Sequence, residues 1–124
     1  MLVYQTFATD LLEPPEAARL YPPLAIIPAN MSPAFFEETS RRVGFQITQK
    51  DPIGSEWREA WEEDGTRTTS TQLLHLARLR RKRSDYIAAL GRPMYEVELA
   101  NCYWGVYQML GKLCPICYIL RKPG

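Results

Sequence analysis

The sequence is poor in the residues that build metal centres and disulfide frameworks. Its 124 residues include one histidine and three cysteines, and an odd number of cysteines without an export signal argues against a disulfide framework. Cys114 and Cys117 have thioredoxin-like spacing but fall in an expected strand, where residues three apart point to opposite faces. A zinc site would need two more ligands, and only Cys102 and His75 remain. We therefore expect no metal or redox function.

Long apolar runs are also missing. No run approaches the ~20 residues that a membrane span needs, and the first residues lack the basic-then-apolar layout of a secretory signal. The composition, 46% hydrophobic and 23% charged, is that of an ordinary globular protein. The length suits one domain with a single core, residues 1–124. We expect a cytoplasmic protein that does not contact a membrane.

Charges of opposite sign concentrate in opposite halves of the chain. Residues 1–65 hold 5 basic and 11 acidic residues, whereas residues 66–124 hold 10 basic and 3 acidic ones. The one strong basic cluster, residues 78–83, comprises Arg78, Arg80, Arg81, Lys82 and Arg83. It can contact nucleic-acid phosphates, or it can be a solvated helix end, where positive charge is favourable without a ligand. We favour the solvated helix end, and a small nucleic-acid-binding module stays as the alternative.

Three segments are predicted to be strands. Residues 1–8 are rich in β-formers and apolar on both alternating faces, as in a central strand covered on two sides. Residues 45–52 begin with alternating apolar and polar side chains and end at a proline, a pattern that suits an edge strand. Residues 114–120 are apolar on both faces and are expected to return between the other two. The predicted order is first-last-second, with the last strand antiparallel to both neighbours.

Helices are predicted between these strands. The prolines of residues 10–28 permit only a turn of helix around residues 16–20 within a structured loop. Ser32 can cap a crossover helix that has Pro33 at its first position and ends before Gly44. Its expected apolar stripe comprises Phe35, Phe36, Thr39 and Val43.

A helical insert over about residues 66–113 precedes the last strand. Ser84 can cap a short helix that ends near Gly91, and Pro93 can begin a longer one. The longer helix is apolar over most of its circumference, so it should pack on two sides. Its narrow polar or small stripe comprises Glu98, Asn101, Gly105, Gln108 and Lys112. The expected fold class is therefore α/β, with three strands, one crossover helix and this insert.

This closing order of strands resembles the C-terminal half of a class I S-adenosylmethionine-dependent methyltransferase. Four stretches resemble the tail of the small-molecule methyltransferases of the ubiquinone/menaquinone-biosynthesis-like superfamily, namely residues 43–45 (VGF), 52–59 (PIGSEWRE), 74–79 (LHLARL) and 103–112 (YWGVYQMLGK). The resemblance covers nearly all of the chain and implies a partial Rossmann-like sheet, a methyl transfer to a small-molecule acceptor, and S-adenosylmethionine as cofactor.

The family's cofactor-binding signature is absent from the sequence. That signature is a glycine-rich loop after the first strand of the family's sheet, and the seven glycines here never form a Gly-x-Gly turn. By the resemblance, Met1 already lies in the family's fifth strand. We therefore expect a truncated protein that is inactive alone, and an uncovered first strand that drives homo-oligomerisation or pairing with a separate N-terminal half.

Seven residues are candidates for contact with the acceptor. Ligands of open α/β sheets sit beyond the carboxyl ends of the parallel strands, which selects Gln5, Thr6 and Phe7. Trp57, followed by Arg58, can line the same mouth. Tyr103, Trp104 and Tyr107 can form an aromatic cover over a planar acceptor such as a quinol or phenol. The competing interpretations are that Phe7 and the three aromatic residues pack in the core, that Thr6 bonds the neighbouring strand, and that Trp57 is a surface residue packed beneath the helical insert.

No catalytic base can be named from the sequence. Methyl transfer from a sulfonium is an in-line displacement that needs positioning first and a base only for a weakly nucleophilic acceptor. His75 is the only histidine, and its neighbours Leu74 and Leu76 suggest packing. The remaining alternative is a ligand-binding or structural remnant that keeps the acceptor pocket without chemistry.

Overall fold

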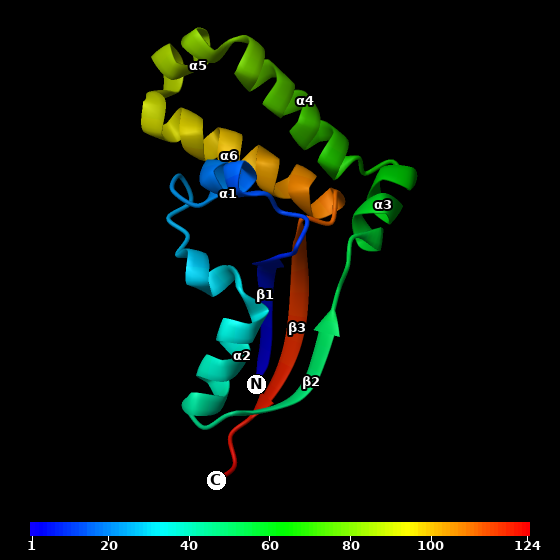
Figure 1. Cartoon of the computed structure of the whole chain (residues 1–124). Coiled ribbons are helices and arrows are strands. Elements are labelled where there is room, and N and C mark those ends of the chain that lie inside the picture. The colour runs from blue at the N-terminus through cyan, green and yellow to red at the C-terminus, as the bar shows by residue number, and fades with distance from the viewer.

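The computed structural model describes residues 1–124 and contains one three-stranded sheet (Figure 1). The strands are β1 (Leu2–Ala8), β2 (Gln46–Pro52) and β3 (Leu113–Arg121), arranged in the order β1-β3-β2. β3 pairs antiparallel with both neighbours, so β1 and β2 run in the same direction. The order and directions predicted from the sequence are therefore confirmed.

β1 is an edge strand, as the predicted strand order requires, but only one of its faces is covered, whereas its sequence suggested two covered faces. Val3 and Phe7 point toward the core of the sheet, where Phe7 is 1% exposed. On the opposite face Leu2 and Tyr4 are exposed, at 69% and 59%. No strand pairs with the outer side of β1, although the 3-10 helix at Pro28–Met31 contacts this strand, and the apolar surface of Leu2 and Tyr4 is exposed.

The crossover helix α2 (Pro33–Arg42) covers the inner face of the sheet. The Ser32 hydroxyl accepts a hydrogen bond from the Phe35 backbone N–H at 3.4 Å, and Pro33 occupies the first turn, as predicted. Phe36 packs against Phe7 and Tyr118, with ring centroids 5.8 and 4.8 Å away. The predicted stripe is narrower than expected, because Phe35 and Val43 at its margins are exposed.

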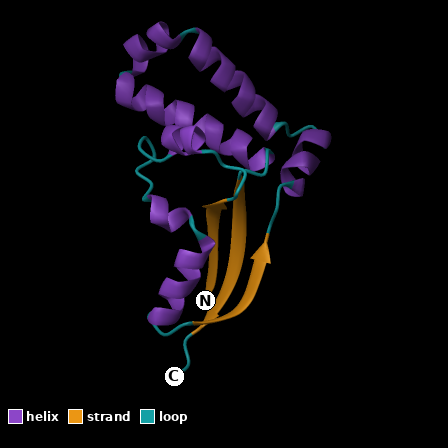
Figure 2. Ribbon diagram, in the orientation of Figure 1, coloured by secondary structure: helices purple, strands orange, loops and turns teal.

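The remaining helices gather at the end of the sheet where β1 and β2 finish (Figure 2). They are α1 (Pro14–Leu20), α3 (Glu56–Glu63), α4 (Thr68–Arg81), α5 (Arg83–Leu90) and α6 (Arg92–Met109), and a short 3-10 helix at Pro28–Met31 precedes α2. α5 begins one residue before Ser84, so Lys82 and not Ser84 is its N-terminal cap residue. Gly91, at φ +80°, turns the chain so that α6 runs back along α4.

Buried side chains form two clusters where the sequence predicted one core. The first lies among α1, α4 and α6 and includes Leu20, Leu79 and Tyr107. The second lies between the sheet and α2 and includes Phe7 and Tyr118. The sheet and the helical insert are thus each packed around their own apolar cluster. None of the helices combines the length and apolarity that crossing a lipid bilayer requires.

The polar stripe predicted on α6 packs against other helices at Gly105 and Gln108, which are both buried. Gln108 accepts a hydrogen bond at 2.9 Å from Nε of Arg58, which comes from α3. Glu98 lies 3.6 Å from His75 of α4. Because these partners come from separate helices, the stripe joins α3, α4 and α6 by polar contacts, while other faces of α6 enter the apolar cluster.

Candidate functional site

A cavity of about 250 Å³ opens between α1, the junction of α4 with α5, and the first half of α6. We call it the arginine pocket, and it is lined by Arg19, Arg80, Arg83, Tyr95, Leu99 and Tyr103. Its volume lies just below the range of about 300–1,000 Å³ that is usual for small-molecule sites. The helices that form it lie beyond the end of the sheet at which β1 and β2 finish (Figure 1).

Arg19 reaches the pocket from the last turn of α1. Its guanidinium lies 5.1 Å from the ring centroid of Tyr103 and donates a hydrogen bond to the Tyr107 hydroxyl at 3.4 Å. This hydrogen bond to Tyr107, together with the nearby Tyr103, raises the pKa of Arg19. Stacking on a ring engages the flat face of a guanidinium and leaves its in-plane N–H groups free to bind an acceptor.

Arg80 and Arg83 reach the same pocket because the helical path is interrupted at Lys82, between the end of α4 and the start of α5. One terminal nitrogen of Arg80 donates to the Tyr103 hydroxyl. Arg83 lies 5.9 Å from the ring centroid of Tyr95. The Tyr95 hydroxyl donates in turn to the Leu79 carbonyl oxygen at 3.0 Å, which holds that ring in place.

The pocket carries three positive charges and no carboxylate that neutralises them. No Asp or Glu oxygen lies within 4.0 Å of a guanidinium nitrogen of Arg19, Arg80 or Arg83. A guanidinium has five N–H donors, and only one hydrogen bond is made by Arg19 and one by Arg80. The arrangement therefore offers many unused donors around one small volume, which suits an anion with several oxygens.

A second cavity of about 260 Å³ adjoins the first and shares Arg19 and Leu99 as a common wall. It is lined by Ala18, Arg19, Pro22, Pro23, Glu96 and Leu99. Leu99 and the two prolines give this cavity an apolar surface, whereas the first presents mainly arginine and tyrosine. The Glu96 carboxylate belongs to the same lining, so the wall of this second cavity is only partly apolar.

Two of the three aromatic residues predicted on the last helix meet at this site. Tyr103 lines the pocket, and Tyr107 lies beside it with its ring centroid 5.4 Å from that of Tyr103. Both are buried, at 6% and 4% exposure, so they present their hydroxyls and ring edges more than an open face. Trp104 is half-buried against the helical cluster and does not line the pocket.

The predicted residues of β1 lie elsewhere. Phe7 is enclosed in the cluster between the sheet and α2, so the sheet itself is its environment. The Gln5 side chain donates to the Asn30 carbonyl oxygen at 3.1 Å and lines a separate cavity beside α2. Thr6 is half-buried and pairs with Pro115 of β3. The structure does not bring these three residues to the arginine pocket.

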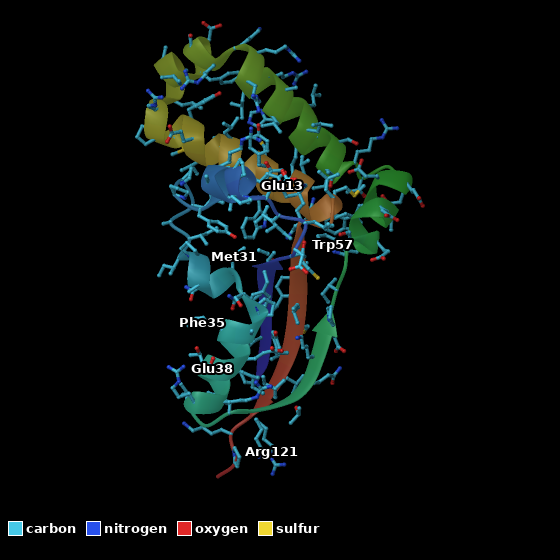
Figure 3. All side chains as sticks on the ribbon, viewed as in Figure 1. Glu13, Met31, Phe35, Glu38, Trp57 and Arg121 are labelled. Atoms are coloured by element: carbon cyan, nitrogen blue, oxygen red, sulfur yellow. The ribbon has the colours of Figure 1, made fainter.

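Trp57 is also separate from the pocket. It lies on α3 near the helical end of the sheet (Figure 3). Its indole N–H donates to the Gly54 carbonyl oxygen at 3.0 Å, and its ring packs edge-on against Trp61. The neighbouring Arg58 is 7% exposed and donates hydrogen bonds to Gln108 and Thr69, both at 2.9 Å. Burial lowers the pKa of Arg58, which has no carboxylate partner.

His75 and the cysteines do not take part in the arginine pocket. His75 Nε2 lies 3.6 Å from a Glu98 carboxylate oxygen, and both side chains are more than two-fifths exposed. The three cysteines are free thiols, and burial raises the pKa of Cys102. No group of three His, Cys, Asp or Glu side chains is placed to hold a metal ion.

Sequence reasoning missed Arg19, Tyr95 and Leu99 as pocket residues and assigned Arg80 and Arg83 only to a basic cluster. The one usable signal was the absence of acidic residues at neighbouring helical positions around Arg80. Arg78, Arg81 and Lys82 of that cluster are exposed and form no ion pair.

No family model matches the chain, and a search of curated proteins gave no match.

Proposed function

We propose that this chain is the acceptor-binding part of a class I S-adenosylmethionine-dependent methyltransferase for a small molecule. The observation that carries the proposal is the antiparallel last strand, β3, inserted between two parallel strands. β3 lies between β1 and β2, which are parallel to one another, and α2 crosses between them. The resemblance in the sequence implies that strand order, and the helical insert before β3 agrees with it.

The position of the arginine pocket supports the same proposal. Ligands of open α/β sheets bind beyond the carboxyl ends of the parallel strands. The pocket lies on that side, since α1 follows β1 directly and α6 leads into β3. Tyr103 and Tyr107, selected from the sequence as acceptor contacts, are in or beside it. The acceptor pocket of the proposed enzyme is therefore the arginine pocket and its apolar neighbour.

The residues of this chain do not fit S-adenosylmethionine in the manner of the family. Backbone amides in a glycine-rich turn between a strand and a helix would be needed, and Gly54 is the only glycine between β2 and α3. A Cβ added at Gly54 would lie 2.5 Å from a Glu56 carboxylate oxygen, which also accepts from the Ser55 N–H. That carboxylate repels an anionic ligand group. The cofactor would have to be held by residues outside this chain.

The open side of β1 is the proposed place for the partner. Its outer edge offers unpaired backbone N–H and C=O groups, and Leu2 and Tyr4 expose apolar surface next to them. Such an edge readily pairs with another strand. We propose that a cofactor-binding half covers it, and that copies of this chain associate through it when that half is absent.

The test is a search for the cofactor half followed by a binding measurement. The genomic sequence on the 5′ side of the Met1 codon is read for a glycine-rich loop, and the corresponding polypeptide is produced with this chain. Calorimetric titration with S-adenosylhomocysteine is expected to show one site in the combined protein and none in the 124-residue chain. A combined protein that folds and binds none, or a 5′ sequence without such a loop, would reject the proposal.

A nucleic-acid-binding module is the second candidate function. Residues 78–83 place five exposed basic side chains on one helix junction, and none of them forms an ion pair. A gel shift with single-stranded and duplex oligonucleotides at increasing salt tests it. Binding that weakens steeply with salt and is lost in Arg78→Gln and Arg81→Gln supports the module, because both side chains lie outside the arginine pocket.

A further inference from the structure

We infer that the arginine pocket binds a small organic anion, a carboxylate or a phosphate monoester, whose apolar body lies over Leu99 toward Pro22 and Pro23. Three arginines from two separate parts of the chain line one cavity, and the adjoining cavity has an apolar wall of Leu99, Pro22 and Pro23 with Glu96 also in its lining. The role of this ligand as the methyl acceptor rests on the proposed function. The binding of the anion in the pocket does not depend on the proposed function.

The three arginines are held as anion receptors before any ligand arrives. The guanidinium carbons of Arg19 and Arg83 lie over the rings of Tyr103 and Tyr95 at 5.1 and 5.9 Å from the ring centroids, and Arg80 donates to the Tyr103 hydroxyl. These contacts use ring faces and hydroxyl oxygens, which leave most in-plane N–H groups without an acceptor. Since the side chains are already ordered, less rotamer entropy is lost when an anion binds.

Repulsion among the three cations is the physical reason to expect a ligand. Arg19 of α1 is held in the pocket by the Tyr107 hydroxyl and the Tyr103 ring, while Leu20 beside it anchors α1 in the helical cluster. No carboxylate oxygen lies within 4.0 Å of these guanidiniums, and Glu16 acts on Arg19 only from farther away, so each guanidinium raises the electrostatic cost of the other two. An anion in the middle relieves that repulsion and accepts several charge-assisted hydrogen bonds.

The size and lining of the cavities select a small ligand over a polymer. The arginine pocket measures about 250 Å³ and the apolar neighbour about 260 Å³. Tyr95, Leu99 and Tyr103 surround the cations with apolar surface, whereas a nucleic-acid backbone is normally met by an open basic face. The exposed Arg78 belongs to such an open face and does not line either cavity.

The binding test uses phenyl phosphate, benzoate and the neutral benzamide as probes. Each is titrated calorimetrically into the 124-residue chain at low salt, and no S-adenosylmethionine derivative is present, so failure here is distinct from failure of the proposed function. Phenyl phosphate, benzoate or both are expected to saturate one site at millimolar concentration. The preferred probe identifies the anion as phosphate or carboxylate. Benzamide binding equal to that of the anions, or no binding of either anion, would overturn the inference.

Variants decide whether the pocket is the site. Arg19→Gln and Arg80→Gln are each expected to weaken anion binding about tenfold or more, as loss of a charge-assisted hydrogen bond implies. Arg80→Lys keeps the charge but loses the planar fork, so it is expected to bind more weakly than the wild type as well. Arg78→Gln, which removes the same charge from the same helix outside the pocket, should bind like the wild type.

Two outcomes of the variant series would reject the pocket. Equal weakening by Arg78→Gln and Arg80→Gln would mean that net charge alone attracts the probe. The arginines would belong to a nucleic-acid surface if the chain binds an oligonucleotide that the anionic probes do not displace, and if both Arg80→Gln and Arg78→Gln abolish that binding. Circular dichroism confirms that each variant is folded. Because Arg19, Arg78 and Arg80 are all exposed, Gln at these positions should preserve the fold.

Discussion

Gln72 of α4 fills the space in which Gly105 of α6 would carry a side chain. A Cβ built on Gly105 would lie 1.8 Å from the Gln72 side-chain oxygen. The same oxygen accepts a hydrogen bond from Arg58 at 3.2 Å, so Gln72 cannot move away without losing that contact. The glycine therefore permits the close approach of α4 and α6. The junction of α4 with α5 forms one wall of the arginine pocket.

Gly105→Ala is expected to destabilise the protein by about 1 kcal/mol. Displacing Gln72 and overpacking the contact together cost more than the roughly 1 kcal/mol of helix propensity that alanine contributes over glycine. In the Gln72→Ala background the space is open, and Gly105→Ala should then be stabilising. Urea unfolding of the two single variants and the double variant measures the change of sign. Equal effects of Gly105→Ala in both backgrounds would show that the contact does not restrict α6.

Arg58→Met is expected to lower the free energy of unfolding by about 2 kcal/mol. The substitution keeps the length of the side chain but leaves the buried oxygens of Gln108 and Thr69 without their donor. Arg78→Met, at an exposed position, is the control and should change stability by less than about 0.5 kcal/mol. Chemical denaturation compares the two variants. A stabilising Arg58→Met would mean that desolvation of the guanidinium outweighs its hydrogen bonds.

Thr39→Val is expected to raise stability by about 1 kcal/mol. The Thr39 hydroxyl oxygen is buried in α2 and is the one buried side-chain polar atom that has no hydrogen-bond partner. Valine has nearly the same shape and removes the desolvation cost of the unpaired hydroxyl. Thermal unfolding of Thr39→Val and of Thr39→Ser, which keeps the hydroxyl, makes the comparison. A loss of stability in Thr39→Val would show that the hydroxyl has a partner in solution.

Stability should fall at alkaline pH because of Tyr118. Burial raises the pKa of Tyr118 to about 12, above the ordinary tyrosine value of 10.0 that applies to the unfolded chain. Between these values the folded state holds a proton that the unfolded state has lost, so this stabilisation is present below pH 10 and declines by about 1.4 kcal/mol per pH unit up to 12. Unfolding curves from pH 8 to 12 for the wild type and Tyr118→Phe test this, and parallel declines would contradict it.

The strand order and the crossover helix were predictable from sequence because their signals are local. Alternation, proline and the Ser32–Pro33 start of α2 each act within a few residues. The arginine pocket was not predictable, because Arg19 meets Tyr107 across 88 residues and only the turn at Gly91 brings α6 into reach. The α6 stripe shows the same limit: whether Gln108 faces solvent or Arg58 depends on where α3 folds.

The open edge of β1 should drive self-association of the isolated chain. Leu2 and Tyr4 are exposed on β1, and Ile119 of the neighbouring β3 is 39% exposed beside them. Tyr4→Lys is expected to reduce association, because a lysine on an edge strand opposes pairing with another strand. Leu74→Lys on α4 is the control, since it adds the same charge at an exposed leucine far from this edge.

Light scattering at micromolar concentration, with binding of a hydrophobic dye, makes the measurement. The wild type and Leu74→Lys should scatter as dimers or larger species and bind dye, and Tyr4→Lys should shift toward monomer. The separate cofactor half, once identified, should produce the same shift by covering β1. A wild-type chain that stays monomeric and binds no dye would remove the reason to expect either partner at this edge, because an uncovered apolar strand cannot be silent in both measurements.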